Sequence, residues 1–131
     1  MKKIKVAQVI TRMDWGGSPD IVRIICSHLD SDIFDVRLVV GLTEHPSAKT
    51  SAFMGKFGDK ITVIPQLKRN IEPLNDLIAF IKLYVFFKKE RFDIVHTHTA
   101  KAGTLGRAAA FLSATGPAII HTPHGHNFYG Y

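Results

Sequence analysis

Short apolar runs alternate with helix-length segments along the whole 131-residue chain, and this alternation limits the fold more than any other feature. Strands that alternate with helices form a parallel sheet with right-handed crossovers and with helices on both faces. The runs predict strands at 4–11, 34–42, 61–65, 94–98 and 118–122, and the segments between them predict helices at 18–29, 47–57, 73–91 and 100–114.

This pattern predicts a Rossmann-like α/β fold with about five parallel strands in the order 3-2-1-4-5. The first and fourth strands are then neighbours where the winding direction reverses, and open α/β sheets bind ligands outside the carboxyl ends of such strands. No linker divides the chain, so 1–131 is predicted to be one domain. The segment after the fifth strand contains no helix that would cover that strand. Either the strand is an exposed edge or another domain or chain covers it, and we expect the second.

The charge and the cysteine content limit the classes of function. The formal net charge of +6 suits a phosphate-rich ligand such as a nucleotide, a nucleic acid or an anionic lipid. The sequence has neither the strand motif of an RRM nor a GXXG loop in a KH setting, so we expect no nucleic acid. The single cysteine, Cys26, excludes an intrachain disulfide, and its apolar neighbours predict a buried hydrophobe.

Two features bear on where the chain acts. The N-terminal run contains Lys5 and is too short for a signal peptide, so we expect a cytoplasmic location. In the helix 73–91, Phe86 falls on the polar side, beside Lys88 and Lys89. Two interpretations are open: the helix contacts an anionic membrane surface, or it is a core helix with an unusually apolar surface. The stripe predicted to cover the sheet consists of Leu74, Leu77, Ile78, Ile81, Tyr84 and Val85, and it is widened by Phe80, Leu83 and Phe87.

The loop after the first strand is the first candidate site. Gly16 and Gly17 lie between the strand and the next helix, where glycine lets the backbone approach a ligand. The helix start that follows offers free N–H groups to an anion. The pair forms neither a G-x-G-x-x-G fingerprint nor a Walker loop. A tight turn without a ligand is therefore the alternative.

The fourth strand ends in a second group of polar residues. His96 and His98 share one face of this strand, and we expect His96 to be the deeper one and His98 to lie at the mouth with Thr99. Lys101 at the start of a helix is unfavourable for the helix dipole, which points to a negatively charged ligand, although a solvated lysine is an equal alternative. Arg107 is interpreted as a solvated or ion-paired helix residue.

The fifth strand ends in the sequence His121-Thr-Pro-His-Gly-His. His121 is interpreted as structural, whereas His124 lies in a loop at the predicted crevice and is the stronger functional candidate. The histidines lack the carboxylate or the helix spacing of a zinc hydrolase site, so we expect no metal. A nucleophile elbow is also absent, which argues against a triad hydrolase.

Three segments together resemble the N-terminal half of a family-4 retaining glycosyltransferase of the GT-B fold. They are Gly16-Gly17, Phe92-Asp-Ile-Val-His-Thr-His-Thr-Ala-Lys-Ala-Gly-Thr-Leu-Gly-Arg and Ile120-His-Thr-Pro-His-Gly. Such enzymes have two Rossmann-like domains that face each other across a cleft. The resemblance covers essentially the whole chain and is closest to bacterial enzymes that build capsule, exopolysaccharide or lipopolysaccharide. It implies the acceptor-side domain of a hexosyltransferase, without the C-terminal donor-binding domain.

The resemblance also implies roles for individual residues. Gly16 and Gly17 would lie near the donor diphosphate and the reacting sugar. His124 would contact the transferred sugar and support the transition state, which makes it the implied catalytic residue. The resemblance and the polar residues at the strand ends together suggest a set of residues that bind the acceptor. These candidates are Asp14, Trp15, His98, Thr99, Lys101 and Tyr129.

The implied partners are a nucleotide-sugar donor, a saccharide or lipid-linked acceptor, and a donor-binding domain or subunit. The family uses no metal or other cofactor, because cationic side chains and helix dipoles stabilise the leaving diphosphate. The exposed last strand and the cleft face are surfaces through which the chain could form a homo-oligomer. Attachment to the inner face of the plasma membrane is a further expectation.

The family's donor-side basic pair and paired glutamates are not in this sequence, so we expect the chain alone to be inactive. The alternative is a non-catalytic Rossmann-like module that binds a nucleotide or a protein.

Overall fold

The structure is a computed structural model that describes residues 2–123. Its strands are β1 (Ile4–Ile10), β2 (Phe34–Val40), β3 (Ile61–Val63), β4 (Ile94–His98) and β5 (Ala118–Thr122). Its helices are α1 (Gly17–His28), α2 (Ala48–Phe57), α3 (Pro73–Glu90) and α4 (Ala100–Leu112), with a short 3₁₀ turn η1 (Gly58–Lys60). The predicted order of strands and helices is therefore confirmed.

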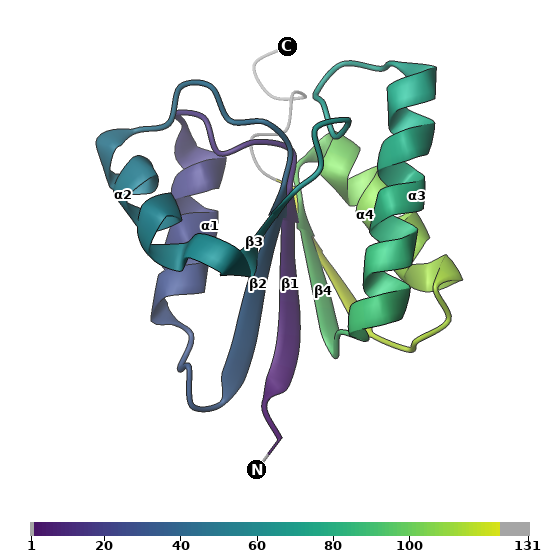
Figure 1. The fold of residues 1–131 in the computed structure, drawn as a ribbon, viewed down its shortest axis with the longest axis horizontal. Helices are drawn as coiled ribbons and strands as arrows, with labels where there is room; N and C mark the ends of the chain where they lie inside the picture. The colour runs from purple at the N-terminus through teal and green to yellow at the C-terminus, as the bar shows by residue number, and fades with distance from the viewer. Residues whose placement is uncertain (1, 124–131) are drawn as a thin grey trace.

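The five strands form one parallel sheet in the order β3-β2-β1-β4-β5, as the sequence predicts. Helices α1 and α2 cover one face of the sheet, and α3 and α4 cover the other (Figure 1). β1 pairs with β4 over the register Val6↔Ile94 to Val9↔Thr97. The loops that begin α1 and α4 therefore lie side by side at the carboxyl ends of these two strands.

Each face of the sheet has its own apolar core, because successive side chains of a strand point to opposite faces. Val9 and Val95 belong to the cluster under α3 and α4. Ile10 and Val40 belong to the cluster under α1 and α2, together with Cys26. The prediction that Cys26 is a buried hydrophobe is confirmed, since only 6% of the residue is exposed.

The orientation of α3 differs in part from the prediction. The buried residues of this helix are Ala79, Leu83 and Phe87, of which Leu83 and Phe87 were predicted to widen the covering stripe, whereas much of the main stripe faces outward. Phe86, predicted on the polar side, packs against the core, with its ring centroid 5.5 Å from that of Phe92. We call the residues of the outward stripe the α3 outer face: Leu74, Leu77, Ile81 and Val85, which are 72%, 56%, 50% and 55% exposed.

The helix is apolar around most of its circumference, so periodicity alone cannot select the buried side. Large rings gain more from burial than aliphatic side chains do, and Phe86, Phe87 and Phe92 form a contiguous aromatic group in the core. The small residue Ala79 is fully buried on the same helix, and α3 packs against α4. These two features account for the observed orientation.

The last strand is not fully covered by the described part of the chain. β5 lies at the edge of the sheet, and Ala118, Ile119 and Ile120 are exposed within the described part of the chain. Whether another domain or chain covers this strand stays a prediction.

Two glycines let α4 pack closely against the end of the sheet. A Cβ atom at Gly106 would lie 2.7 Å from Thr97 Cγ2, and one at Gly103 would lie 2.8 Å from His121 Nδ1. Both separations are shorter than any ordinary van der Waals contact. The ring of His121 therefore rests on the bare backbone of α4.

We predict that Cys26 is inert in the native chain. Burial raises the pKa of its thiol to about 12, so the reactive thiolate is scarce at neutral pH and becomes abundant only near pH 12. A disulfide exchange reagent at pH 8 should label the native chain far more slowly than the urea-unfolded chain. Equal labelling rates for the two states would contradict the burial.

We predict that Gly103→Ala destabilises the chain by about 1–3 kcal/mol, because the added methyl displaces the His121 ring. Gly55→Ala is the matched control. Its Cβ atom would meet nothing within 4 Å in α2, so this change should stabilise the chain by about 0.5–1 kcal/mol. Urea denaturation of both variants measures the two effects. A neutral Gly103→Ala would show that His121 does not need this contact.

Candidate functional site

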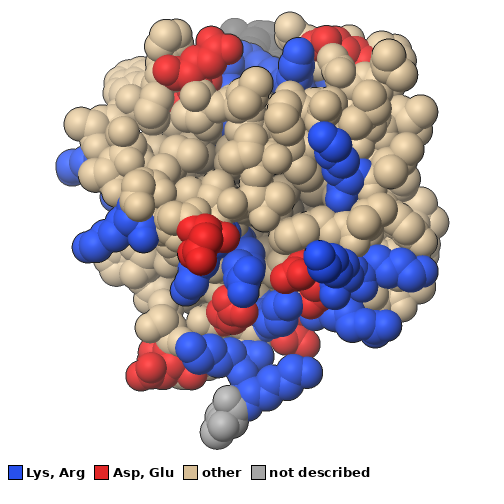
Figure 2. Space-filling model, in the orientation of Figure 1, with Lys and Arg blue, Asp and Glu red and all other residues tan. Residues whose placement is uncertain are grey.

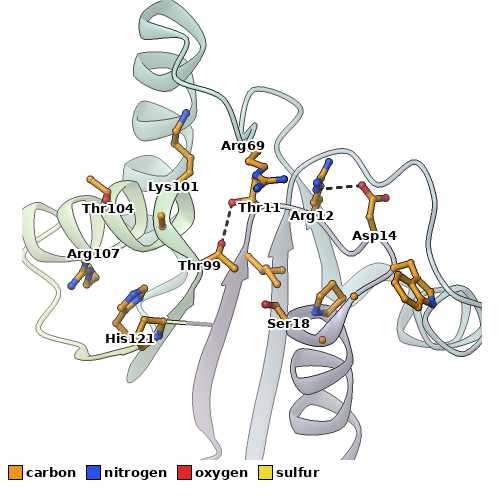
Figure 3. A pocket seen from close by; sticks show the side chains of 17 residues that line it. Thr11, Arg12, Asp14, Ser18, Arg69, Thr99, Lys101, Thr104, Arg107 and His121 are labelled. Carbon is orange, nitrogen blue, oxygen red and sulfur yellow. Dashed lines mark hydrogen bonds and ion pairs between the residues drawn. The ribbon is translucent and has the colours of Figure 1, made fainter. Parts of the chain in front are cut away.

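A crevice with a volume of about 660 Å³ lies between the starts of α1 and α4, at the carboxyl ends of β1 and β4. We call it the central crevice. Its walls come from the loop after β1, from the first turns of α1 and α4, and from Arg69 and His121 of more distant segments (Figure 3). The structure thus places the crevice at the switch point that the sequence predicts.

The loop after β1 forms one wall. Gly16 has φ 155° and ψ 176°, a backbone conformation that is almost restricted to glycine. Gly17 begins α1, and both glycines line the crevice. Free N–H groups at the start of α1 therefore adjoin the crevice, the arrangement that suits an anion.

Asp14 and Trp15 connect this loop to the loop after β2. Oδ1 of Asp14 accepts hydrogen bonds of 2.7 Å from the backbone N–H groups of Glu44 and His45, and Oδ2 lies 3.5 Å from Nε of Arg12. The backbone N–H of Trp15 donates to the carbonyl of His45 at 2.9 Å. The indole stays outside this network, since Trp15 is 81% exposed on the wall of the crevice.

Thr99 forms the opposite wall in an unusual conformation. Its φ of 69° and ψ of 170° lie in a region that β-branched residues rarely adopt, and such strain concentrates at functional sites. Its hydroxyl lies 3.4 Å from that of Thr11, across the junction of β1 and β4 (Figure 3). The expectation that Thr99 lies at the mouth of the crevice is confirmed.

Lys101 lines the crevice, but its charge is already paired. Its Nζ lies 2.6 Å from Oδ1 of Asp76 on α3 and also donates to the carbonyl of Asn70. The sequence argument was that Lys101 neutralises the negative charge of a ligand. In the structure the carboxylate of Asp76 already neutralises Lys101, so that argument is incomplete. The pair also ties the first turn of α4 to the first turn of α3.

His98 does not lie at the mouth, which corrects the prediction. Its side chain is fully buried, and Nε2 lies 2.6 Å from Oε1 of Gln8 on β1. His96, predicted to be deeper, is only half-buried, and its Nε2 lies 2.7 Å from Oγ1 of Thr122. The depths are reversed because Gln8 provides a polar partner inside the sheet, so a histidine can be buried there at little cost.

His121 and Arg107 line the crevice, although neither was predicted to belong to the site. Nδ1 of His121 lies 2.9 Å from the hydroxyl oxygen of Thr97, so His121 also has the structural role that the sequence predicts. Nε of Arg107 donates to the carbonyl of Gly103 at 2.9 Å, and the residue is exposed. Arg107 lies about two helical turns after the start of α4, on the same side of the helix as Ala100 and Thr104, which also line the crevice.

Arg69 is a site residue that has no counterpart among the sequence predictions. It is exposed, lies between β3 and α3, and lines the central crevice (Figure 3). A second crevice of about 470 Å³ adjoins the first and shares Thr11, Arg12, Asp14 and Arg69 with it. The sequence did carry a signal for Arg69, because it is a basic residue that follows the end of β3. The carboxyl ends of parallel strands meet at one edge of the sheet, where ligands bind.

The lining of the central crevice carries an excess of positive charge. Its one carboxylate among the described residues is that of Asp14, whose Oδ1 is engaged by backbone N–H groups. Its cationic side chains are those of Arg12, Arg69, Lys101 and Arg107, of which Arg12 is paired with Asp14 and Lys101 with Asp76. The first turns of α1 and α4 add the positive ends of two helix dipoles. Guanidinium groups and helix N-termini are groups that bind phosphate in proteins.

Two predicted site residues, His124 and Tyr129, lie outside the described residues. Within residues 2–123, no group of three or more histidine, cysteine, aspartate or glutamate side chains could hold a metal ion.

Comparison with known proteins identifies the family. The model of Glycosyltransferase Family 4 matches residues 15–131. The chain is 38% identical over 104 residues to the UDP-Gal:alpha-D-GlcNAc-diphosphoundecaprenol alpha-1,3-galactosyltransferase of Escherichia coli, a match that covers 76% of this chain and 24% of the relative. It is 34% identical over 70 residues to the capsular polysaccharide biosynthesis glycosyltransferase CapM of Staphylococcus aureus, covering 53% and 18%.

Solved structures agree on the fold. A UDP-N-acetylglucosamine 2-epimerase superposes with a TM-score of 0.64 at 18% identity, over 99% of this chain and 37% of that one. A putative UDP-N-acetylglucosamine 2-epimerase from Listeria monocytogenes gives 0.63 at 16% identity, over 93% and 32%. The chain thus spans about a third of these structures and a quarter or less of the curated relatives.

These findings do not favour the alternative of a non-catalytic module. The predicted family, the sheet order and the position of the crevice agree with one another. The chain therefore belongs to glycosyltransferase family 4.

Proposed function

We propose that this chain is the acceptor-side domain of a nucleotide-sugar-dependent retaining glycosyltransferase that acts in bacterial surface polysaccharide synthesis. The observation that carries the proposal is the cationic crevice between the starts of α1 and α4. Family membership supports the reaction class, and the two curated relatives support the polysaccharide setting.

The charge of the crevice suits substrates that carry a diphosphate. The Escherichia coli relative is named for a UDP-sugar donor and a sugar-diphosphate-polyprenol acceptor, and both contain this group. Arg69 and Arg107 are exposed in the crevice and carry no salt bridge within the described residues. We propose that these two arginines bind a substrate diphosphate.

The remaining site residues divide between donor and acceptor in the proposal. Gly16 and Gly17 allow the donor diphosphate to approach the backbone at the start of α1. The acceptor is bordered by Asp14, Trp15, Thr99 and Lys101, of which Asp14 and Lys101 act mainly by holding the walls in place. His124 is proposed to contact the transferred sugar, and Tyr129 the acceptor.

The donor-binding half is proposed to come from a second domain or subunit. Glycosyl transfer needs the donor, the acceptor and charge stabilisation in one closed cleft. We propose that cationic side chains and helix dipoles stabilise the leaving diphosphate without a metal. A location on the inner face of the plasma membrane follows from a lipid-linked acceptor and is part of the same proposal.

We predict that Arg69→Ala combined with Arg107→Ala weakens the binding of a diphosphate substrate by at least about tenfold, because two charge-assisted contacts are lost. The probe is N-acetylglucosamine linked through diphosphate to a short prenyl chain. Trp15 is the only tryptophan of the sequence and lines the crevice, so its fluorescence reports binding directly.

The matched control is Lys49→Ala combined with Lys56→Ala, which removes two exposed charges from α2. It should leave the affinity within about twofold, because solvent and salt screen charges that lie outside the crevice. Equal affinities for the arginine variant and the unchanged chain would contradict the assigned site.

We also predict that the purified chain alone, given UDP-galactose and the same acceptor, forms no product above the protein-free rate. The reason is that one wall of a cleft cannot orient both substrates. Product analysis by chromatography checks this outcome. Sustained turnover by the chain alone would overturn the two-part site.

A further inference from the structure

The α3 outer face is an apolar stripe of which each residue is at least half exposed within the described part of the chain. Leu74, Leu77, Ile81 and Val85 follow spacings of three and four residues, which places them on one side of the helix. The stripe extends over about 17 Å at the helical rise of 1.5 Å per residue. Ile71, which precedes α3 and is 85% exposed, extends it toward the loop that carries Arg69.

Lysines accompany this stripe. Lys82, Lys88 and Lys89 are exposed on α3, and none of them forms a salt bridge within the described residues. Nζ of Lys82 donates to Oε1 of Gln66, and Nζ of Lys88 lies 5.6 Å from the centroid of the Tyr84 ring. Figure 2 shows lysine and arginine side chains beside and below the largely uncharged surface over α3.

The acidic residues of α3 point elsewhere. Asp76 pairs with Lys101 of α4, and Oε1 of Glu90 lies 3.6 Å from Nζ of Lys5. Both carboxylates are therefore directed toward the body of the protein and are neutralised there. The outward side of the helix consequently combines aliphatic side chains with positive charge and lacks a compensating carboxylate from α3.

We infer that the α3 outer face docks on the surface of a bilayer that contains anionic lipids. Aliphatic side chains enter the boundary between headgroups and acyl chains, and the lysines contact the negative headgroups. No helix in residues 2–123 is long and apolar enough to cross a membrane, so the inferred contact of this helix is with the surface.

This contact would place the central crevice at the bilayer. The salt bridge from Lys101 to Asp76 joins the crevice wall to the first turn of α3, so the stripe begins beside the crevice. A diphosphate bound by Arg69 could then keep its lipid tail in the membrane. The inference deepens the proposed function, on which it rests for the identity of the acceptor.

A lipid surface fits the charge pattern better than a second copy does. Two copies that met through this face would bring their lysines together, and like charges would oppose the contact. An anionic bilayer instead attracts every lysine on the face.

Flotation of the whole chain with vesicles tests the inference. The vesicles are phosphatidylcholine alone or an equimolar mixture with phosphatidylglycerol, without any acceptor. We expect the chain to float with the anionic vesicles and to be released by high salt. Leu77→Gln with Ile81→Gln, and separately Lys88→Glu with Lys89→Glu, should each reduce binding by at least about tenfold.

Two controls match these changes. Phe111→Gln alters an exposed apolar residue on α4, and Lys49→Glu with Lys56→Glu reverses two exposed charges on α2, across the sheet from α3 (Figure 1). Both should bind as the unchanged chain does. Circular dichroism establishes that each variant is folded, and the two independent α3 variants keep the test decisive if one fails to fold.

Failure of this inference and failure of the proposed function give different results. Docking is overturned if the chain does not float, or if both α3 variants float as well as the unchanged chain, even when Trp15 still reports diphosphate binding. Docking is also overturned if Leu77→Gln with Ile81→Gln dissociates a dimer without loss of flotation. Flotation that depends on α3 supports docking, even if the crevice binds no diphosphate and the proposed function fails.

Discussion

The parallel pairing of β1 with β4 is the contact on which the site depends. It joins segments about ninety positions apart in the chain, with Gln8 opposite His96 and Val9 opposite Thr97. Because parallel strands end at the same edge, this pairing brings the Gly16 loop and the start of α4 together. The hydroxyl contact between Thr11 and Thr99 marks the junction.

Close packing of α4 then completes the site, because Gly103 and Gly106 carry no side chain that would hold the helix away from β4 and β5. A helix with larger residues at these two positions would have to move outward, and the crevice would lose one wall.

The two sides of α3 have different consequences. Its inner side supplies the aromatic core and the carboxylate that pairs with Lys101. Its outer side leaves aliphatic residues and lysines in solvent. One helix therefore connects the cationic crevice, which suits diphosphates, to a surface that suits anionic lipids.

The sequence alone determined the order of strands and helices, the parallel sheet, the switch point and the family. These follow from local periodicity, from glycine and proline positions and from motif residues, all of which can be read along the chain. The positions of Thr99 and of the Gly16 loop followed from the same reading.

Only the tertiary structure decided which side of α3 is buried, which histidine is deep and which charges are paired. Periodicity could not orient α3, because apolar residues surround most of that helix. His98 is buried because Gln8 of another strand lies beside it, and Lys101 is paired because Asp76 of another helix reaches it. Such partners are far away in sequence, so their effect appears only when the strands and helices pack together.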